Sequence, residues 1–156
     1  MLADELKAVF TEKGLTLATA ESCTGGLLGA AITSVPGSSA YYMGGVISYA
    51  NSAKIDLLGV DPDVLEQAGA VSIQTAEEMA RGARERFKVD GALSITGIAG
   101  PGGGTEEKPV GLTFMALAEE GRITIQRLMG HGSREENRND AVEIALKWLI
   151  EWAQTY

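Results

Sequence analysis

Residues 18–32, ATAESCTGGLLGAAI, place a carboxylate, a serine, a cysteine and a threonine between a buried strand and an apolar helix. The apolar run over residues 15–20 predicts the strand, and the run after Gly26 predicts the helix. Ser22 or Thr24 can cap that helix, because both residue types are favoured at helix starts. A serine there also lies near free backbone N–H groups that can hold an oxyanion or a phosphate. A helix cap and a nucleophile therefore remain as two interpretations of Ser22.

Outside this stretch, helical and strand patterns alternate, and several strands then come together before a last helix. We predict helices within residues 3–14, 51–60, 61–70, 72–88 and 133–154, strands within residues 15–20, 41–49 and 91–100, and a hairpin over residues 110–129 that turns at residues 119–121. Asp61, Ser72 or Thr75, and Ser133 are the expected caps. This order predicts one α/β domain over residues 1–156, a layered α/β sandwich with a mixed β-sheet. Ligands of such sheets bind at the carboxyl ends of strands, which selects the loops after Ala20, Tyr49 and Thr96.

Composition excludes several classes of partner. The net charge of −8 argues against nucleic-acid binding, which needs clustered Lys and Arg. No apolar run approaches the roughly 18 residues needed to cross a bilayer, and no targeting segment opens the chain, so we expect a cytoplasmic protein without a membrane partner. Cys23 is the only cysteine, which rules out an internal disulfide and a cysteine-based metal cage. No metal-ligand cluster is visible, and we expect neither a metal nor a cofactor.

A serine nucleophile needs a base to remove its proton. The only histidine, His131, lies in a polar GHGS turn and has no aspartate partner at a suitable spacing. Lys54 follows Tyr49 by five residues in SYANSAK, and a helix that starts near Asn51 puts Lys54 in its first turn. The helix dipole there disfavours a protonated amine and lowers its pKa. Tyr49 can relay the proton or hold the hydroxyl and the amine together. A surface lysine and a core tyrosine are the alternatives.

Three further features can complete a site. The glycine-rich stretch SITGIAGPGGGTEEKPVG, residues 94–111, can present the Thr96 hydroxyl and backbone N–H groups to a ligand, or it is only a flexible connection. Arg134 and Arg138 share one face of the last helix and suit phosphate oxygens, or they are a solvated pair. Cys23 is either a second candidate nucleophile at the helix start or a small buried apolar side chain.

Five segments occur in an order that is specific to one family: TAESCTGG, GSSAYYMGGVISYANSAK, GAVS, SITGIAGPGGGTEEKPVG and SREENR. Together they resemble the C-terminal domain of the competence/damage-inducible protein CinA, a family that includes stand-alone nicotinamide-nucleotide amidases, also called NMN deamidases. The resemblance runs from about Leu2 to the end of the chain. It implies hydrolysis of nicotinamide mononucleotide (NMN) to nicotinate mononucleotide and ammonia, and hence pyridine-nucleotide recycling. The companion N-terminal molybdopterin-binding-like domain is absent, so we expect the stand-alone form.

The resemblance also implies the residues of the site. Ser22, Tyr49 and Lys54 match the family's catalytic set without departure. The expected substrate-binding residues are Glu21, Thr24, Gly25, Gly26, Ser39, Asn51, Thr96, Gly97, Gly100, Arg134 and Arg138. We expect a small-molecule nucleotide substrate and a homo-oligomer. Two alternatives stay open: a regulatory module that binds a nucleotide without hydrolysing it, and a partner-binding domain linked to competence or the DNA damage response.

Overall fold

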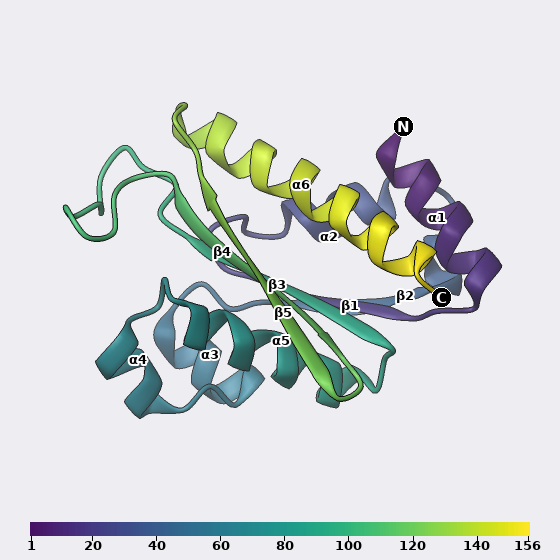
Figure 1. Ribbon diagram of the computed structural model, residues 1–156, viewed down its shortest axis with the longest axis horizontal. Helices are drawn as coiled ribbons and strands as arrows, with labels where there is room; N and C mark the ends of the chain where they lie inside the picture. The colour runs from purple at the N-terminus through teal and green to yellow at the C-terminus, as the bar shows by residue number, and fades with distance from the viewer.

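Five strands form one mixed sheet at the centre of the computed structural model, which describes residues 1–156 (Figure 1). Their spatial order is β2 (Tyr42–Ile47), β1 (Leu17–Glu21), β3 (Gly91–Gly97), β4 (Leu112–Glu119) and β5 (Arg122–Met129). β1 is parallel to both of its neighbours, whereas β4 is antiparallel to β3 and to β5. The predicted α/β sandwich with a mixed sheet is therefore confirmed.

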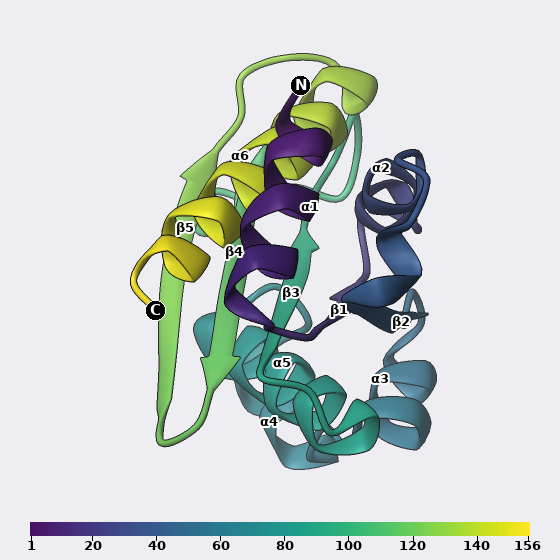
Figure 2. The ribbon, with the colours of Figure 1, turned by 90° about the vertical axis from the view of Figure 1, so that its right-hand side faces the viewer.

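Helices cover both faces of this sheet. One face carries α1 (Leu2–Lys13), α2 (Leu27–Thr33) and α6 (Arg134–Gln154), and the other carries α3 (Asn51–Leu58), α4 (Pro62–Ala68) and α5 (Ile73–Phe87) (Figure 1). Figure 2 shows the same layers from the side, with α1 packed along α6. A short 3₁₀ turn, η1 (Ser38–Ala40), precedes β2. All five residues of β1 are buried, as expected for a parallel strand covered on both faces.

Most helix boundaries follow the cap signals in the sequence. α1 and α3 end at Gly14 and Gly59, whose φ angles of 65° and 69° are left-handed and therefore suit glycine. The side chains of Asp61, Ser72 and Ser133 each accept a backbone N–H at the start of α4, α5 and α6. These predicted caps are confirmed, and Ser72 rather than the threonine three residues later caps α5.

The start of α2 contradicts the predicted cap. Neither Ser22 nor Thr24 caps this helix; the N-cap residue is Gly26, and its φ of 104° differs from the extended backbone of an ordinary cap. The carboxylate of Glu21, at the end of β1, accepts the N–H groups of the first turn instead. The local pattern missed this because the acceptor lies on the preceding strand, not on the turn beside the helix.

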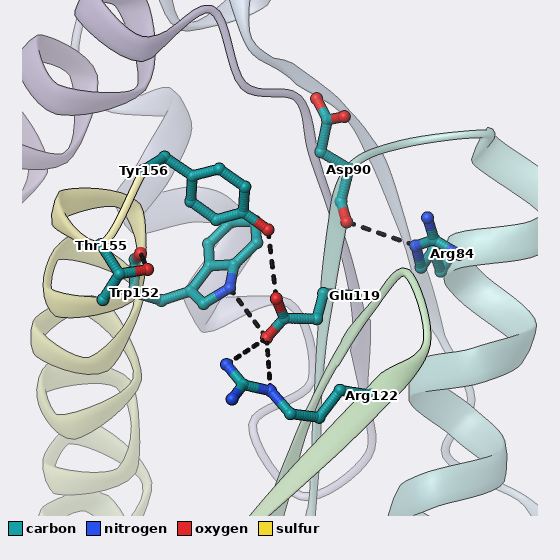
Figure 3. Close-up of polar contacts among 7 residues, drawn as sticks. All are labelled: Arg84, Asp90, Glu119, Arg122, Trp152, Thr155 and Tyr156. Atoms are coloured by element: carbon teal, nitrogen blue, oxygen red, sulfur yellow. Dashed lines mark hydrogen bonds and ion pairs between the residues drawn. The ribbon is translucent and has the colours of Figure 1, made fainter.

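Glu119, at the turn between β4 and β5, fastens the end of α6 to the sheet (Figure 3). Its Oε2 accepts Nη2–H of Arg122 at 2.9 Å and Nε1–H of Trp152 at 3.2 Å, and its Oε1 accepts the hydroxyl of Tyr156 at 3.1 Å. Because β4 runs antiparallel to β3, this network lies at the amino end of the parallel strands.

The crossing of α3 and α5 gives a stability prediction. A Cβ added to Gly82 would lie 1.9 Å from the backbone oxygen of Leu58. Gly82→Ala should therefore lower the free energy of unfolding by about 2 kcal/mol, although alanine is intrinsically favoured in helices by roughly 1 kcal/mol. Urea unfolding measures the change. Gly102→Ala, where no atom lies within 4 Å, is the control and should be nearly neutral; a Gly82→Ala variant as stable as wild type would contradict the packing.

Candidate active site

The carboxyl ends of β1, β2 and β3 meet around a cavity of about 190 Å³. The chain leaves β1 through α2 on one face and leaves β2 through α3, α4 and α5 on the other, so a crevice opens at the end of β1. The cavity is lined by Ser22, Cys23, Tyr49, Lys54, Ala70, Val71, Thr96, Gly97, Ala99 and Arg134. Residues from all three loops selected on sequence grounds therefore contribute to one site.

Lys54 is the most deeply buried charged residue of the site, with 1% of its surface exposed. Its Nζ lies 3.1 Å from Oγ of Ser22, 2.8 Å from the backbone oxygen of Ser48 and 3.1 Å from that of Tyr49. Because α3 begins at Asn51, Lys54 lies in the first helical turn, as predicted. Sequence reasoning missed Ser48, which acts through its backbone and so leaves no side-chain signal.

Burial lowers the pKa of Lys54 below its ordinary value of 10.5, because the protonated amine loses its hydration. A neutral amine has two N–H groups and one lone pair. When the two N–H groups donate to the oxygens of Ser48 and Tyr49, the lone pair remains for the Ser22 hydroxyl. In the charged form a third N–H occupies that direction. The lowered pKa therefore favours the state in which Lys54 can accept the serine proton.

Tyr49 takes a different position from the one expected. Its side chain is 63% exposed, and its hydroxyl lies 3.4 Å from Nη2 of Arg134 at the mouth of the cavity. It makes no hydrogen bond with the side chain of Ser22 or Lys54, and its link to the lysine is the backbone oxygen. The structure thus places the Tyr49 side chain at the cavity beside Arg134, not between the hydroxyl and the amine.

Two backbone hydrogen bonds hold Ser22 itself. Ser22 N–H donates to the oxygen of Ile95 at 2.9 Å, and Gly25 N–H donates to the oxygen of Ser22 at 3.1 Å. The amides of Cys23 and Thr24 have no acceptor in the chain. An amide that directly follows a nucleophile is a common donor to a developing oxyanion. Thr24 is fully buried, whereas Cys23 lines the cavity, so the amide of Cys23 is the candidate oxyanion donor.

The thiol of Cys23 is only 7% exposed and packs in the main apolar core. Burial raises the pKa of Cys23 to about 11. A thiol with such a pKa is protonated at neutral pH, and the thiolate is the reactive form. Of the two interpretations of Cys23, the structure favours the small buried apolar side chain.

The two arginines of α6 have different surroundings. Arg134 lines the cavity, and its Nη1–H donates to the oxygen of Gly100 at 2.8 Å. Arg138 lies one turn further along, where its Nε–H and Nη2–H donate to the backbone oxygens of Cys23 and Thr24 at 2.9 and 3.2 Å. Arg134 therefore lies at the cavity, whereas Arg138 binds the backbone of the serine turn, residues 22–26.

Thr96 and Asn137 bind the backbone of two residues that line the cavity, Ala70 and Ala99. Thr96 is buried and its hydroxyl donates to the oxygen of Ala70 at 2.8 Å, so it joins β3 to the loop before α5. Nδ2–H of Asn137 donates to the oxygen of Ala99 at 3.0 Å, and its Oδ1 accepts the N–H of Gly132. The sequence reasoning did not single out Asn137, although it lies between the two arginines in SREENR.

Besides Arg138, seven expected substrate-binding residues lie outside the cavity lining: Glu21, Thr24, Gly25, Gly26, Ser39, Asn51 and Gly100. Glu21 is 2% exposed and Thr24 is fully buried, and the Thr24 hydroxyl donates to Oε1 of Glu21 at 2.6 Å. Ser39 and Asn51 are exposed. The structure therefore brings neither Ser39 nor Asn51 into the site, and it gives Glu21 and Thr24 an internal partner.

A larger cavity, of about 500 Å³, lies at the amino end of the parallel strands near the Glu119 network (Figure 3). It is lined by Glu77, Arg81, Arg84, Glu85, Ala118, Glu119, Gly121, Arg122 and Ile123. Its three arginines are balanced by three glutamates, and it holds no hydroxyl or amine suited to nucleophilic chemistry. Size alone would make this cavity the candidate active site, but the buried pair of Lys54 and Ser22 favours the smaller cavity of about 190 Å³.

The structure contains neither a metal-binding cluster nor a membrane-spanning helix. No group of three or more His, Cys, Asp and Glu side chains is arranged to bind a metal ion. No helix has the length and apolar character needed to cross a membrane.

The fold is a three-layer α/β domain with a buried serine–lysine pair at its strand ends, and similarity to known proteins specifies the family. The family described as CinA C-terminal domain matches residues 1–153. A CinA-like protein of Geotalea daltonii is 52% identical over 141 residues, which cover 90% of this chain and 34% of the relative. A CinA-like protein of Geobacter sp. is 49% identical over 152 residues, covering 97% of this chain and 37% of the relative. The chain belongs to the CinA C-terminal domain family.

Solved structures agree with this assignment. The competence/damage inducible protein CihA from Agrobacterium tumefaciens is 46% identical, with a TM-score of 0.93 and coverage of 96% of this chain and 92% of that one. A CinA superfamily protein from Klebsiella pneumoniae is 34% identical, with a TM-score of 0.95 and coverage of 99% and 97%. The chain spans about a third of the length of the curated relatives that it matches.

The surroundings of Cys23 predict slow alkylation. Because burial raises the pKa of the thiol to about 11, iodoacetamide should modify the folded protein at pH 8 far more slowly than the same protein in urea. The rate should also rise with pH up to about that value. Intact-mass spectrometry over time measures both. Modification of the folded protein as fast as in urea would show that the thiol is exposed and ionisable.

Proposed function

We propose that this protein is an amidohydrolase that converts NMN to nicotinate mononucleotide and ammonia, with Ser22 as the nucleophile and Lys54 as the base. The observation that carries the proposal is the 3.1 Å contact between Nζ of Lys54 and Oγ of Ser22 in a buried site. Membership of the CinA family and the sequence resemblance to its NMN deamidases supply the substrate.

The attack follows from the arrangement of the lysine. Neutral Lys54 accepts the hydroxyl proton while its two N–H groups stay on the backbone oxygens of residues 48 and 49. Oγ of Ser22 then forms a bond to the carboxamide carbon. The amide of Cys23, which lines the cavity, donates to the oxygen as it becomes negative.

The same lysine completes the cycle. Protonated Lys54 gives its proton to the leaving nitrogen as the C–N bond breaks, and ammonia departs from a Ser22 ester. A water molecule then attacks the ester carbon, its proton passes to Lys54, and the C–O bond to Ser22 breaks. The proton returns to Oγ of Ser22, and nicotinate mononucleotide leaves. No step requires a metal ion.

The size of the cavity suggests which part of the substrate it holds and which part lies outside. At about 190 Å³ it is smaller than the roughly 300–1,000 Å³ usual for small-molecule sites. It suits the carboxamide-bearing ring, and the ribose phosphate would extend through the mouth. Arg134 lies there beside the exposed ring of Tyr49, and its guanidinium provides the positive charge that a phosphate needs.

Removing either member of the pair should stop the reaction. Ser22→Ala and Lys54→Met should each lower kcat by about a thousandfold or more, and the double variant should lose little further, because the two groups act as a unit. Ammonia release from NMN is the measurement. Cys23→Ala is the control and should stay within a few fold of wild type, because its backbone amide is unchanged.

The outcomes of that assay separate the alternatives. Near-normal ammonia release by Ser22→Ala would exclude Ser22 as the nucleophile. Binding of NMN to the wild type without release of ammonia would replace the hydrolase with a nucleotide-binding module.

The pH dependence of kcat/KM should report the pKa of Lys54. Because burial lowers its pKa, Lys54 loses its proton as the pH rises through a value below 10.5. kcat/KM should therefore increase about tenfold per pH unit at low pH and level off above that lowered pKa. Steady-state assays across a series of buffers test this. A rate that falls with rising pH, or a midpoint at or above 10.5, would contradict a neutral Lys54 base.

A further inference from the structure

We propose that Glu21 is a positioning residue: its buried carboxylate fixes the Ser22–Gly26 turn, and thereby the Ser22 hydroxyl, in the orientation needed for attack. This inference rests on the proposed nucleophilic role of Ser22. It gives Glu21 a function that does not involve contact with the substrate.

The contacts of Glu21 span the turn from one end to the other. Glu21 ends β1 directly before the nucleophile and is 2% exposed. Its Oε1 accepts the Thr24 hydroxyl at 2.6 Å and the N–H of Leu28 at 2.9 Å. Its Oε2 accepts the N–H of Gly29 at 3.0 Å. One side chain therefore joins the end of the strand, the middle of the turn and the first turn of α2.

The charge of Glu21 is balanced by dipoles and not by a cation. No Lys, Arg or His side chain forms an ion pair with it. Two amides at the start of α2 and one hydroxyl donate to it instead, and a helix start favours a carboxylate. Burying a carboxylate without such donors would be costly. These amides are consequently occupied, which explains why the start of α2 offers no site to a substrate anion.

The turn needs this link because its own backbone is permissive. Gly25 and Gly26 adopt φ angles of 56° and 104°, a region that glycine enters freely. No side chain of the turn caps α2. Backbone bonds hold Ser22 itself, and Arg138 holds the two following carbonyls from α6. The carboxylate is the element that sets where α2 begins relative to β1, and so sets the path of the chain around Ser22.

Glu21→Gln tests the role with little change in size. One carboxylate oxygen becomes an NH₂ group that faces N–H or O–H donors, so at least one of the three hydrogen bonds is lost. Misplacing a reacting group by about 1 Å can cost a hundredfold in rate. We expect Glu21→Gln to lower kcat for NMN by about a hundredfold and to change KM by less than about threefold, because no substrate contact is removed.

Thr24 provides a second and milder test of the same network. Thr24→Val removes the hydroxyl bound to Glu21 but keeps the shape of the side chain, and we expect a loss in kcat of about tenfold. Thr24→Ser restores a hydroxyl and should recover most of that loss. A structural effect of volume alone would not follow this order, because valine is closer in size to threonine than serine is.

Asp61→Asn is the matched control, because it makes the same carboxylate-to-amide change at the start of another helix. Asp61 accepts the N–H of Asp63 at the start of α4 and does not line the cavity that contains Ser22. Its variant should keep the wild-type kcat. Circular dichroism and thermal unfolding of every variant establish that the fold is retained.

A fluorophosphonate that labels activated serines separates this inference from the choice of substrate. In that reaction Oγ of Ser22 bonds to phosphorus, fluoride leaves and the hydroxyl proton passes to Lys54. We expect Glu21→Gln to slow labelling in parallel with kcat. If the wild type is labelled but releases no ammonia from NMN, the substrate is wrong and slower labelling of Glu21→Gln still supports the inference. Equal labelling of wild type and Glu21→Gln overturns the inference, and a wild type that takes no label overturns both.

Discussion

The contact between Nζ of Lys54 and Oγ of Ser22 is the interaction on which the rest of the site depends. An amine with 1% exposure is tolerated only where its hydrogen-bonding groups are satisfied, and the backbone oxygens of Ser48 and Tyr49 do this. Those oxygens come from the segment between β2 and α3. The position of the lysine is therefore set by backbone at the end of a strand, which is more rigid than a contact with another side chain.

The order of the strands explains how Ser22 and Lys54, which are 32 positions apart in the sequence, come together. β1 lies between β2 and β3, and both neighbours are parallel to it, so all three strands deliver their following residues to one edge. Ser22 follows β1, Lys54 follows β2, and Thr96 lies at the end of β3. α6 packs on one face of the sheet, and its N-terminal part brings Arg134 to the cavity and Arg138 to the turn that follows β1. Each element supplies one part of the chemistry, and no single segment contains a site.

The sequence predicted what depends on short-range pattern. Strand ends and helix starts are local, so the strand before Ser22 and the helical turn around Lys54 could be placed, and the resemblance connected them. The cap of α2 could not be found in the same way, since a residue of β1 supplies it. The direction of the Tyr49 side chain was also beyond reach, because it depends on where β2 ends and on the place of Arg134 in α6.

The two arginines illustrate the same limit. Their spacing of four residues places both on one helix face, and from that pattern they are equivalent. In the folded protein one turn of helix separates a guanidinium at the cavity from one that binds two carbonyls of the serine turn. Which arginine meets a ligand is decided by the distance from α6 to that turn, a tertiary quantity that helical spacing does not contain.

Burial shifts the pKa values of two neighbouring groups of the site, Cys23 and Lys54, in opposite directions. Withdrawal of water raises the pKa of the Cys23 thiol to about 11 and lowers the pKa of the Lys54 amine. One cause thus favours the uncharged form of both groups, since a low-polarity environment disfavours a thiolate and an ammonium alike. A neutral thiol is a weak nucleophile, whereas a neutral amine is the form that can deprotonate an alcohol. The same dry environment therefore disfavours the reactive form of Cys23 and favours the neutral form of Lys54.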